Sequence, residues 1–215
     1  MATRRICYIA AAGETPCEPF SPAPGDLTIA SDGGYSALTA LGITPDLAVG
    51  DFDSLGAPPE GVEVMRHPKM KDDTDTMLAI QAGMDRGFDT FVIYGGLGGR
   101  LDHSLANIQA LTHIAHRGGR GFLVGGGQNI TVIADGDIRF AGGHSGTVSV
   151  FALGGEARGV DLTGLLYPLE NAVIVPDRPL GVSNEFTGGA ASVAVCRGTL
   201  LVMWQGAFDK SLLRW

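Results

Sequence analysis

The sequence has few cysteines and no long hydrophobic run. Its three cysteines, Cys7, Cys17 and Cys196, are an odd number and lack the spacing of a zinc site or a disulfide framework. We therefore expect a cytoplasmic protein with reduced thiols. No run is apolar over the length that a membrane-spanning helix requires. The short apolar run after Arg4 and Arg5 predicts a buried strand rather than a signal peptide.

Positive charge is also scarce. Fifteen lysines and arginines stand against 23 aspartates and glutamates, which gives a formal net charge of −8. A nucleic-acid-binding surface is normally basic, so this balance argues against nucleic acid as a partner. The acidic residues gather between Asp46 and Asp75, and this part of the chain is the first place to look for a functional site.

Apolar residues and glycine are plentiful. Hydrophobic residues make up 45% of the 215-residue chain and charged residues 18%, which predicts a folded core rather than disorder. Many of the 33 glycines fall in short clusters between apolar runs. Such clusters are typical of loops that approach a ligand closely.

The first half of the chain alternates predicted strands with predicted helices. Strands are expected at 6–11, 27–31, 46–50, 62–67, 90–96 and 121–127, and helices at 33–43, 74–86 and 103–116. This alternation predicts a mostly parallel sheet flanked by helices.

The second half contains short β-like runs without helical periodicity. They lie at 129–134, 137–141, 147–153, 171–175, 191–196 and 199–204. The pair Asp135-Gly136 predicts a hairpin turn between the first two. The sequence therefore predicts an α/β N-terminal domain, residues 1–127, followed by an all-β C-terminal domain, residues 128–215, that forms an antiparallel sandwich or a barrel.

Two aspartates follow the expected strand at 46–50, in the stretch GDFDS. Residues i and i+2 of an extended backbone point to the same side, so Asp51 and Asp53 could share one hard cation. Magnesium in proteins typically takes one or two carboxylates together with water and substrate phosphate oxygens. The alternative is a turn in which both carboxylates bind backbone amides.

Three further carboxylates lie in the stretch KDDTD, just before an expected helix. Any one of Asp72, Asp73 and Thr74 could be the helix N-cap, and Asp75 suits the positive end of the helix dipole. Capping needs only one such residue. We therefore expect this stretch to supply a further metal ligand, and Lys71 to face a phosphate.

The stretch GGLGGRLDH joins an expected strand to an expected helix. Bare backbone amides beside a helix N-terminus form an anion site, and Arg100 could bind phosphate oxygens through its fork of N–H donors. The stretch lacks the Gly-Lys-Ser/Thr of a P-loop and the glycine spacing of a dinucleotide fingerprint. Asp102 could also cap the helix. His103 has no histidine partner at metal-ligand spacing, so we expect it to support either the residues of the site or the structure.

In the second half, the stretches GLLYPLENAV and GVSNEF interrupt the apolar runs. Tyr167 could present a flat ring to an aromatic ligand, with Ser183 and Asn184 as polar groups beside it. The prolines, glycines and asparagines in both stretches also favour turns. Taken singly, these residues do not indicate a site.

In this order, the motifs resemble those of the thiamine pyrophosphokinase family, bacterial type. The matching elements are SDGG, LAVGDFDSL, KDDTDTMLAI, GGLGGRLDHSLANI and the late pair GLLYPL and SNEF. Each element is moderately specific, whereas the ordered set is highly specific.

The resemblance implies an α/β nucleotide-binding domain, a C-terminal β-sandwich and a homodimer with active sites at the subunit interface. It implies Mg²⁺-dependent transfer of the pyrophosphoryl group of ATP to the hydroxyl of thiamine, giving thiamine diphosphate and AMP. The family's metal carboxylates correspond to Asp51, Asp53 and Asp75. Its nucleotide contacts correspond to Asp32, Gly33, Lys71, Asp72, Thr74, Arg100 and Asp102, and its thiamine pocket to Tyr167, Ser183 and Asn184.

The residues fit this chemistry. Phosphoryl-type transfer needs chiefly positioning and neutralisation of phosphate charge. Asp72 is a candidate general base for the hydroxyl proton. Two other hypotheses remain open: a pyrophosphokinase for another heteroaromatic alcohol, such as a hydroxymethyl pterin, and a sensor that binds nucleotide or thiamine without turnover. The full set of Asp51, Asp53 and Asp75 favours catalysis over sensing.

Overall fold

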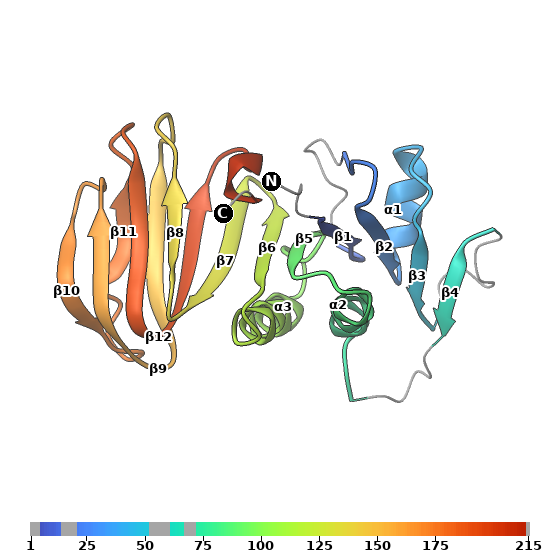
Figure 1. The fold of residues 1–215 in the computed structure, drawn as a ribbon, viewed down its shortest axis with the longest axis horizontal. Helices are drawn as coiled ribbons and strands as arrows, with labels where there is room; N and C mark the ends of the chain where they lie inside the picture. Colours follow the sequence, from blue (N-terminus) through green and yellow to red (C-terminus); the bar gives the residue numbers. More distant parts are fainter. Residues whose placement is uncertain (1–4, 14–20, 52–60, 67–71, 214–215) are drawn as a thin grey trace. The chain divides into compact units, whose positions relative to one another are not determined.

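The computed structural model describes residues 5–13, 21–51, 61–66 and 72–213. The described residues form two compact units (Figure 1). The first contains the described residues up to Ala110 together with Gly121–Gly126. The second contains Leu111–Arg120 and the described residues from Gly127 onward. Each unit is described by itself below.

A parallel sheet forms the centre of the first unit. Its strands are β1 (Cys7–Ala10), β2 (Leu27–Ser31), β3 (Leu47–Gly50), β4 (Glu63–Arg66), β5 (Thr90–Tyr94) and β6 (Arg120–Gly125), in the spatial order β6-β5-β1-β2-β3-β4. The pairings of β1 with β2 and β5, of β2 with β3, and of β3 with β4 are parallel. The isoleucines at the centres of β1, β2 and β5 are fully buried, as in sheets covered on both faces.

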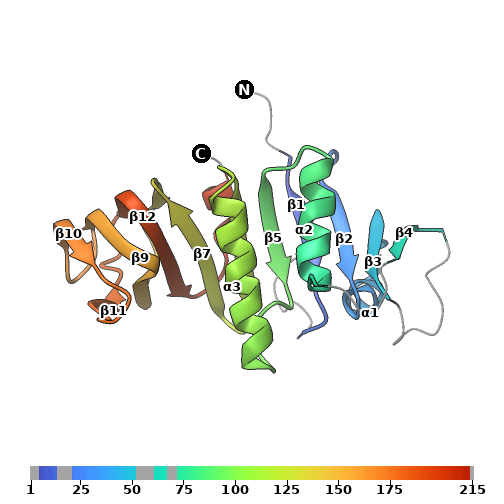
Figure 2. The ribbon, with the colours of Figure 1, turned by 90° about the horizontal axis from the view of Figure 1, so that it is seen from below.

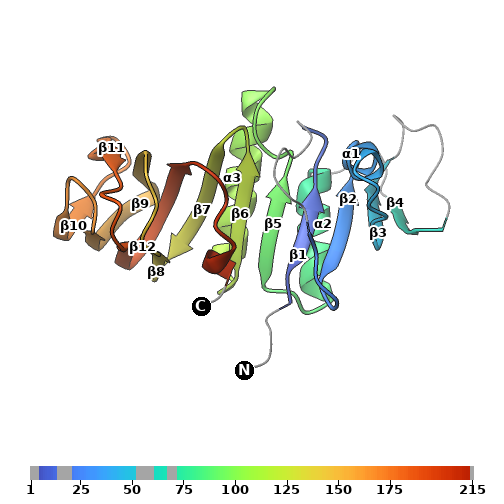
Figure 3. The same ribbon diagram turned by 90° about the horizontal axis from the view of Figure 1, so that it is seen from above.

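Three helices accompany this sheet: α1 (Gly34–Ala40), α2 (Asp75–Asp85) and α3 (Leu101–Ala115). Helix α1 packs on β1 and β2, and α2 packs on β1, β2 and β3 from the opposite face (Figure 3). Helix α3 begins two residues earlier than predicted, so Asp102 lies in its first turn and is not its cap. In the described part of the chain, no helix combines the length and apolar character needed to span a membrane.

The second unit is built on two long antiparallel strands, β9 (Thr147–Thr163) and β12 (Ala191–Gln205). The first part of β12 pairs with β8 (Asp137–Phe140) and its last part with β7 (Gln128–Ala134). The first part of β9 pairs with β11 (Gly181–Glu185) and its later part with β10 (Leu169–Ile174). A short 3₁₀ helix, η1 (Lys210–Leu213), follows.

The predicted hairpin at Asp135-Gly136 is wrong, because β7 and β8 pair with successive parts of β12 and not with each other. The backbone amide of Asp135 donates to the carbonyl of Gly198 at 3.1 Å, and its carboxylate accepts from the amide of Gly198 at 2.8 Å. Gly198 has a φ of +114°, and a Cβ there would lie 2.7 Å from the carbonyl oxygen of Glu156. A glycine is therefore required where β12 passes from one set of partners to the other.

Aromatic side chains fill the centre of the second unit. Phe140 lies 5.0 Å from Phe186 and 5.3 Å from Trp204, ring centroid to centroid, in edge-to-face contacts. All three rings are buried. They come from β8, from the residue after β11 and from β12. The cluster therefore joins β8, which pairs with β12, to the end of β11, which pairs with β9. The more detailed description of this unit as a sandwich stays a prediction.

Candidate active site

Asp32 and Asp51 lie side by side at the carboxyl edge of the parallel sheet. Asp32 follows β2 and Asp51 follows β3. The register places Ser31 opposite Val49, and the amide of Asp32 donates to the carbonyl of Val49 at 2.9 Å. Ligands of open α/β sheets bind at this edge. Both aspartates are half-buried and thus partly open to a ligand.

The backbone around Asp32 is tightly packed. Asp32 has a φ of +47°, in the left-handed region that side chains other than glycine rarely adopt. A Cβ at Gly34 would lie 1.9 Å from the carbonyl oxygen of Ala10, so only glycine lets α1 approach β1 this closely. Gly33, a predicted nucleotide contact, is half-buried at the N-cap of α1. The left-handed backbone at Asp32 and the close approach at Gly34 thus define the turn that places Asp32 at the sheet edge.

The N-terminus of α2 also lies at this edge. In a β-α-β arrangement with parallel strands the helix runs back against them, so its start is near the strands' carboxyl ends (Figure 2). Thr74 is the N-cap: its hydroxyl accepts from the amide of Met77 at 3.2 Å. Asp75 is half-buried in the first turn, whereas Asp72 and Asp73 are exposed and do not cap the helix. Of the three residues that could cap the helix, Thr74 is therefore the one that does.

The predicted metal ligands can be followed only in part. Asp51 and Asp75 lie at the same sheet edge, and carboxylate oxygens are the donors that Mg²⁺ prefers. Asp53 lies outside the described residues, as does Lys71. Among the residues that are described, no group of three or more histidines, cysteines or acids is placed to hold a metal ion. The carboxylates of Asp51 and Asp75 are the kind of ligand that magnesium takes, and the third expected ligand is the Asp53 that lies outside the described residues.

Arg100 and Asp102 form an exposed ion pair at the start of α3. The guanidinium donates twice to the carboxylate, Nε to Oδ1 at 3.1 Å and Nη2 to Oδ2 at 2.6 Å. The hydrogen bond from Arg100 lowers the pKa of Asp102, and the same contact raises the pKa of Arg100. Both side chains are open to solvent, so a phosphate could compete with Asp102 for the guanidinium.

Asn107 is a residue that the sequence reasoning missed. Its side-chain amide is buried and donates to the carbonyl of Gly96 at 2.8 Å. A Cβ at Gly96 would lie 2.8 Å from Leu123, and one at Gly95 would lie 2.6 Å from the carbonyl of Ala11. Asn107 therefore fixes the loop between β5 and α3. Gly95 and Gly96 in this loop are needed for close packing.

In the second unit, the three predicted thiamine-pocket residues are brought together. Tyr167 is 63% exposed. Asn184 is buried, and its side chain binds both the amide and the carbonyl of Tyr167, at 2.9 and 2.7 Å. Ser183 is exposed with a φ of +59°, and its amide donates to the hydroxyl of Ser149 at 3.1 Å.

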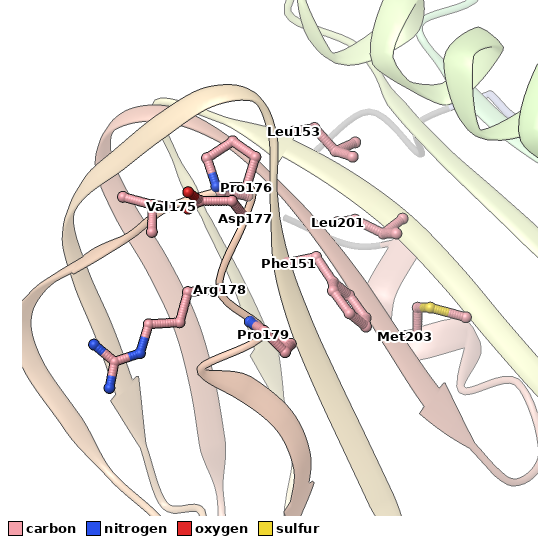
Figure 4. A pocket seen from close by; sticks show the side chains of 10 residues that line it. Phe151, Leu153, Val175, Pro176, Asp177, Arg178, Pro179, Leu201 and Met203 are labelled. Atoms are coloured by element: carbon pink, nitrogen blue, oxygen red, sulfur yellow. The ribbon is translucent and has the colours of Figure 1, made fainter.

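A separate cavity of about 490 Å³ lies on the face of β9 and β12 (Figure 4). Phe151, Leu201 and Met203 line it from the strands, and the segment 175–179 lines it from the other side. None of the predicted site residues lines it. Its lining is mainly apolar, with Asp177 and Arg178 as its charged residues.

Two family models match the chain in succession. The one described as thiamin pyrophosphokinase, catalytic domain, matches residues 24–122. The one described as thiamin pyrophosphokinase, vitamin B1 binding domain, matches residues 137–200. The curated thiamine pyrophosphokinase of Bacillus subtilis (strain 168) is 29% identical over 189 residues, which cover 82% of this chain and 86% of that protein.

Solved structures agree with these matches. The crystal structure of thiamine pyrophosphokinase from Bacillus subtilis has a TM-score of 0.83 at 26% identity, over 95% of this chain and 100% of that chain. The one from Geobacillus thermodenitrificans has a TM-score of 0.80 at 26% identity, over 96% and 99%. The yeast enzyme, 14% identical over 94% and 86% with a TM-score of 0.69, shares the fold. With both domains of one family matched in order, this chain belongs to the thiamine pyrophosphokinase family.

Proposed function

We propose that the chain makes thiamine diphosphate and AMP by transferring the pyrophosphoryl group of ATP to the hydroxyl of thiamine. The observation that carries this proposal is the ordered match of a catalytic and a vitamin B1 binding domain on one chain. The carboxylates at the sheet edge support it, because they lie where α/β folds bind nucleotides. We assign ATP binding to residues 1–127 and thiamine binding to residues 128–215.

The ATP phosphates bind at the carboxyl edge of the parallel sheet in this proposal. Arg100 and Lys71 neutralise phosphate charge, and Asp32, Gly33, Thr74 and Asp102 line the nucleotide. Asp51, Asp53 and Asp75 would hold Mg²⁺, which supplies further neutralisation of the phosphate oxygens.

The acceptor chemistry is an in-line displacement at the β-phosphorus. The thiamine hydroxyl oxygen forms the new bond to this phosphorus, and the bond to the α-β bridging oxygen breaks, so AMP leaves with that oxygen. Asp72, exposed ahead of α2, accepts the hydroxyl proton. Tyr167 stacks on a thiamine ring and Ser183 supplies a hydrogen bond. We further propose a cytoplasmic homodimer whose active sites lie at the subunit interface.

The test is a product assay on the purified chain with ATP, Mg²⁺ and thiamine. AMP and thiamine diphosphate in equal amounts are expected. ADP with thiamine monophosphate would place the attack on the γ-phosphorus and contradict the proposal. Binding of both substrates without product would favour the sensor hypothesis, and turnover of a hydroxymethyl pterin in place of thiamine would favour the other acceptor class.

Single replacements test the carboxylates. Asp51→Asn and Asp75→Asn should abolish AMP formation while the midpoint of urea unfolding stays near that of the wild type, because both side chains are only half-buried. Asp73→Asn is the matched control, since Asp73 is an exposed neighbour with no assigned role. Near-normal turnover in the Asp51 or Asp75 variant would remove that residue from the site.

A further inference from the structure

Tyr167 belongs to a short segment, residues 164–167, that pairs with residues 184–187 position by position. The hydroxyl of Thr187 donates to the carbonyl of Gly164 at 2.9 Å. Leu165 and Phe186 form an isolated antiparallel bridge. The amide of Leu166 donates to the carbonyl of Glu185 at 2.9 Å. Main-chain groups and one hydroxyl therefore fix residues 164–166, which directly precede Tyr167.

At Tyr167 a side chain continues this ladder. The Oδ1 atom of Asn184 accepts from the amide of Tyr167 at 2.9 Å, and its Nδ2 atom donates to the carbonyl of Tyr167 at 2.7 Å. One carboxamide thus supplies the donor and the acceptor that a residue on an opposing strand would supply. The backbone of Asn184 is itself paired with Val148 of β9, and the β11–β9 register shifts between Gly181 and Asn184.

The carboxamide of Asn184 has little left to offer a ligand. Its Oδ1 atom also accepts from the amide of Glu185 at 2.9 Å, so both lone pairs are used, and one N–H of Nδ2 remains. The residue is 3% exposed, whereas Tyr167 is 63% exposed. Any effect of Asn184 on a ligand must therefore pass chiefly through the tyrosine.

We propose that Asn184 is a positioning residue that fixes the backbone of Tyr167 and so aims its ring at the thiamine ring. This rests on the proposed function, and it replaces the expectation that Asn184 contacts thiamine. An asparagine is required because aspartate would place a second acceptor against the carbonyl of Tyr167, and alanine would leave both polar groups of that backbone without the carboxamide.

A double-mutant cycle tests the proposal, with the dissociation constant and KM of thiamine as readouts. Tyr167→Ala should raise both about 2- to 13-fold, the range expected for one lost aromatic contact. Asn184→Asp and Asn184→Ala should raise them by a similar factor, with the KM of ATP unchanged. In the Tyr167→Ala background the Asn184 replacements should add nothing. Glu185→Gln is the control, because this exposed neighbour has no assigned side-chain role and keeps the backbone amide that donates to Asn184.

Independent, multiplying effects of the two residues would overturn the proposal, since Asn184 would then contact thiamine or act on the fold alone. A rise in the KM of ATP with loss of kcat would indicate such a general structural role. If neither Asn184 variant folds, amide hydrogen exchange of the wild-type protein decides. The amide of Tyr167 must be protected as well as that of Leu166, and fast exchange at Tyr167 would refute its hydrogen bond to Asn184. Failure of the proposed function is distinct, because the wild type would then bind no thiamine or yield no AMP.

Discussion

Two replacements of Ser183 should differ in their effect on stability but not in their effect on thiamine binding. Its φ of +59° lies in the left-handed region, which costs an L-residue about 1–2 kcal/mol. Ser183→Ala keeps a Cβ and therefore keeps this cost. Ser183→Gly removes it but adds about 0.5–1 kcal/mol of conformational entropy on folding. The glycine variant should therefore be more stable than the alanine variant by between zero and about 1.5 kcal/mol.

Both variants lose the hydroxyl, and both keep the backbone amide that donates to Ser149. If this hydroxyl binds thiamine, one neutral hydrogen bond is lost, worth roughly 0.5–1.5 kcal/mol or about 2- to 13-fold in KM. The two KM values for thiamine should rise equally despite the difference in stability between the variants. Steady-state kinetics and urea unfolding measure the two quantities. An unchanged KM in both variants would refute the hydroxyl contact, and a glycine variant less stable than the alanine variant would refute the strain argument.

The remaining predictions concern α2 and the C-terminal segment. Thr74→Ala should lower the free energy of unfolding by about 1 kcal/mol and also lower turnover, because the first turn of α2, which carries Asp75, loses its cap. Thr74→Ser keeps a capping hydroxyl and should restore both, as measured by urea unfolding and steady-state kinetics. The pKa of Asp209 is lowered on balance: burial raises it, but hydrogen bonds from Ser211 and His144 outweigh burial. Its contribution to stability is thus present above the ordinary pKa of about 3.9 and is lost as pH falls through the lowered value. Asp209→Asn should weaken the acid dependence of unfolding below about pH 5. An unchanged profile would contradict this assignment.

Strands β2, β3 and β5 of the first unit could be predicted from sequence because each is a short, largely apolar run bounded by glycine or acidic residues. Their parallel pairing brings their carboxyl ends to one edge, so Asp32 and Asp51 could be placed together from their positions after β2 and β3. The start of α2 followed from the polar stretch before it. The choice of Thr74 as cap could not be made, because three neighbouring side chains can cap equally well.

The second unit was harder to predict because its strands are defined by tertiary pairing. Runs at 147–153, 191–196 and 199–204 were expected, but β9 and β12 continue through the glycines that interrupt the apolar pattern. Strand β11 was missed because its residues are polar and its extended form depends on β9. Asn107 gave no signal either, because it binds a backbone carbonyl 11 residues away along the chain. Asn184 was singled out, but its hydrogen bonds to the backbone of Tyr167, 17 residues away, could not be foreseen.

The central claim is pyrophosphoryl transfer to thiamine, and ³¹P NMR of a single reaction tests it most directly. The purified chain would be mixed with ATP, Mg²⁺ and thiamine and the phosphorus signals followed over time. The account predicts that ATP signals are replaced by those of AMP and thiamine diphosphate in equal amounts. Signals of ADP and thiamine monophosphate, or an unchanged ATP spectrum with thiamine bound, would contradict it.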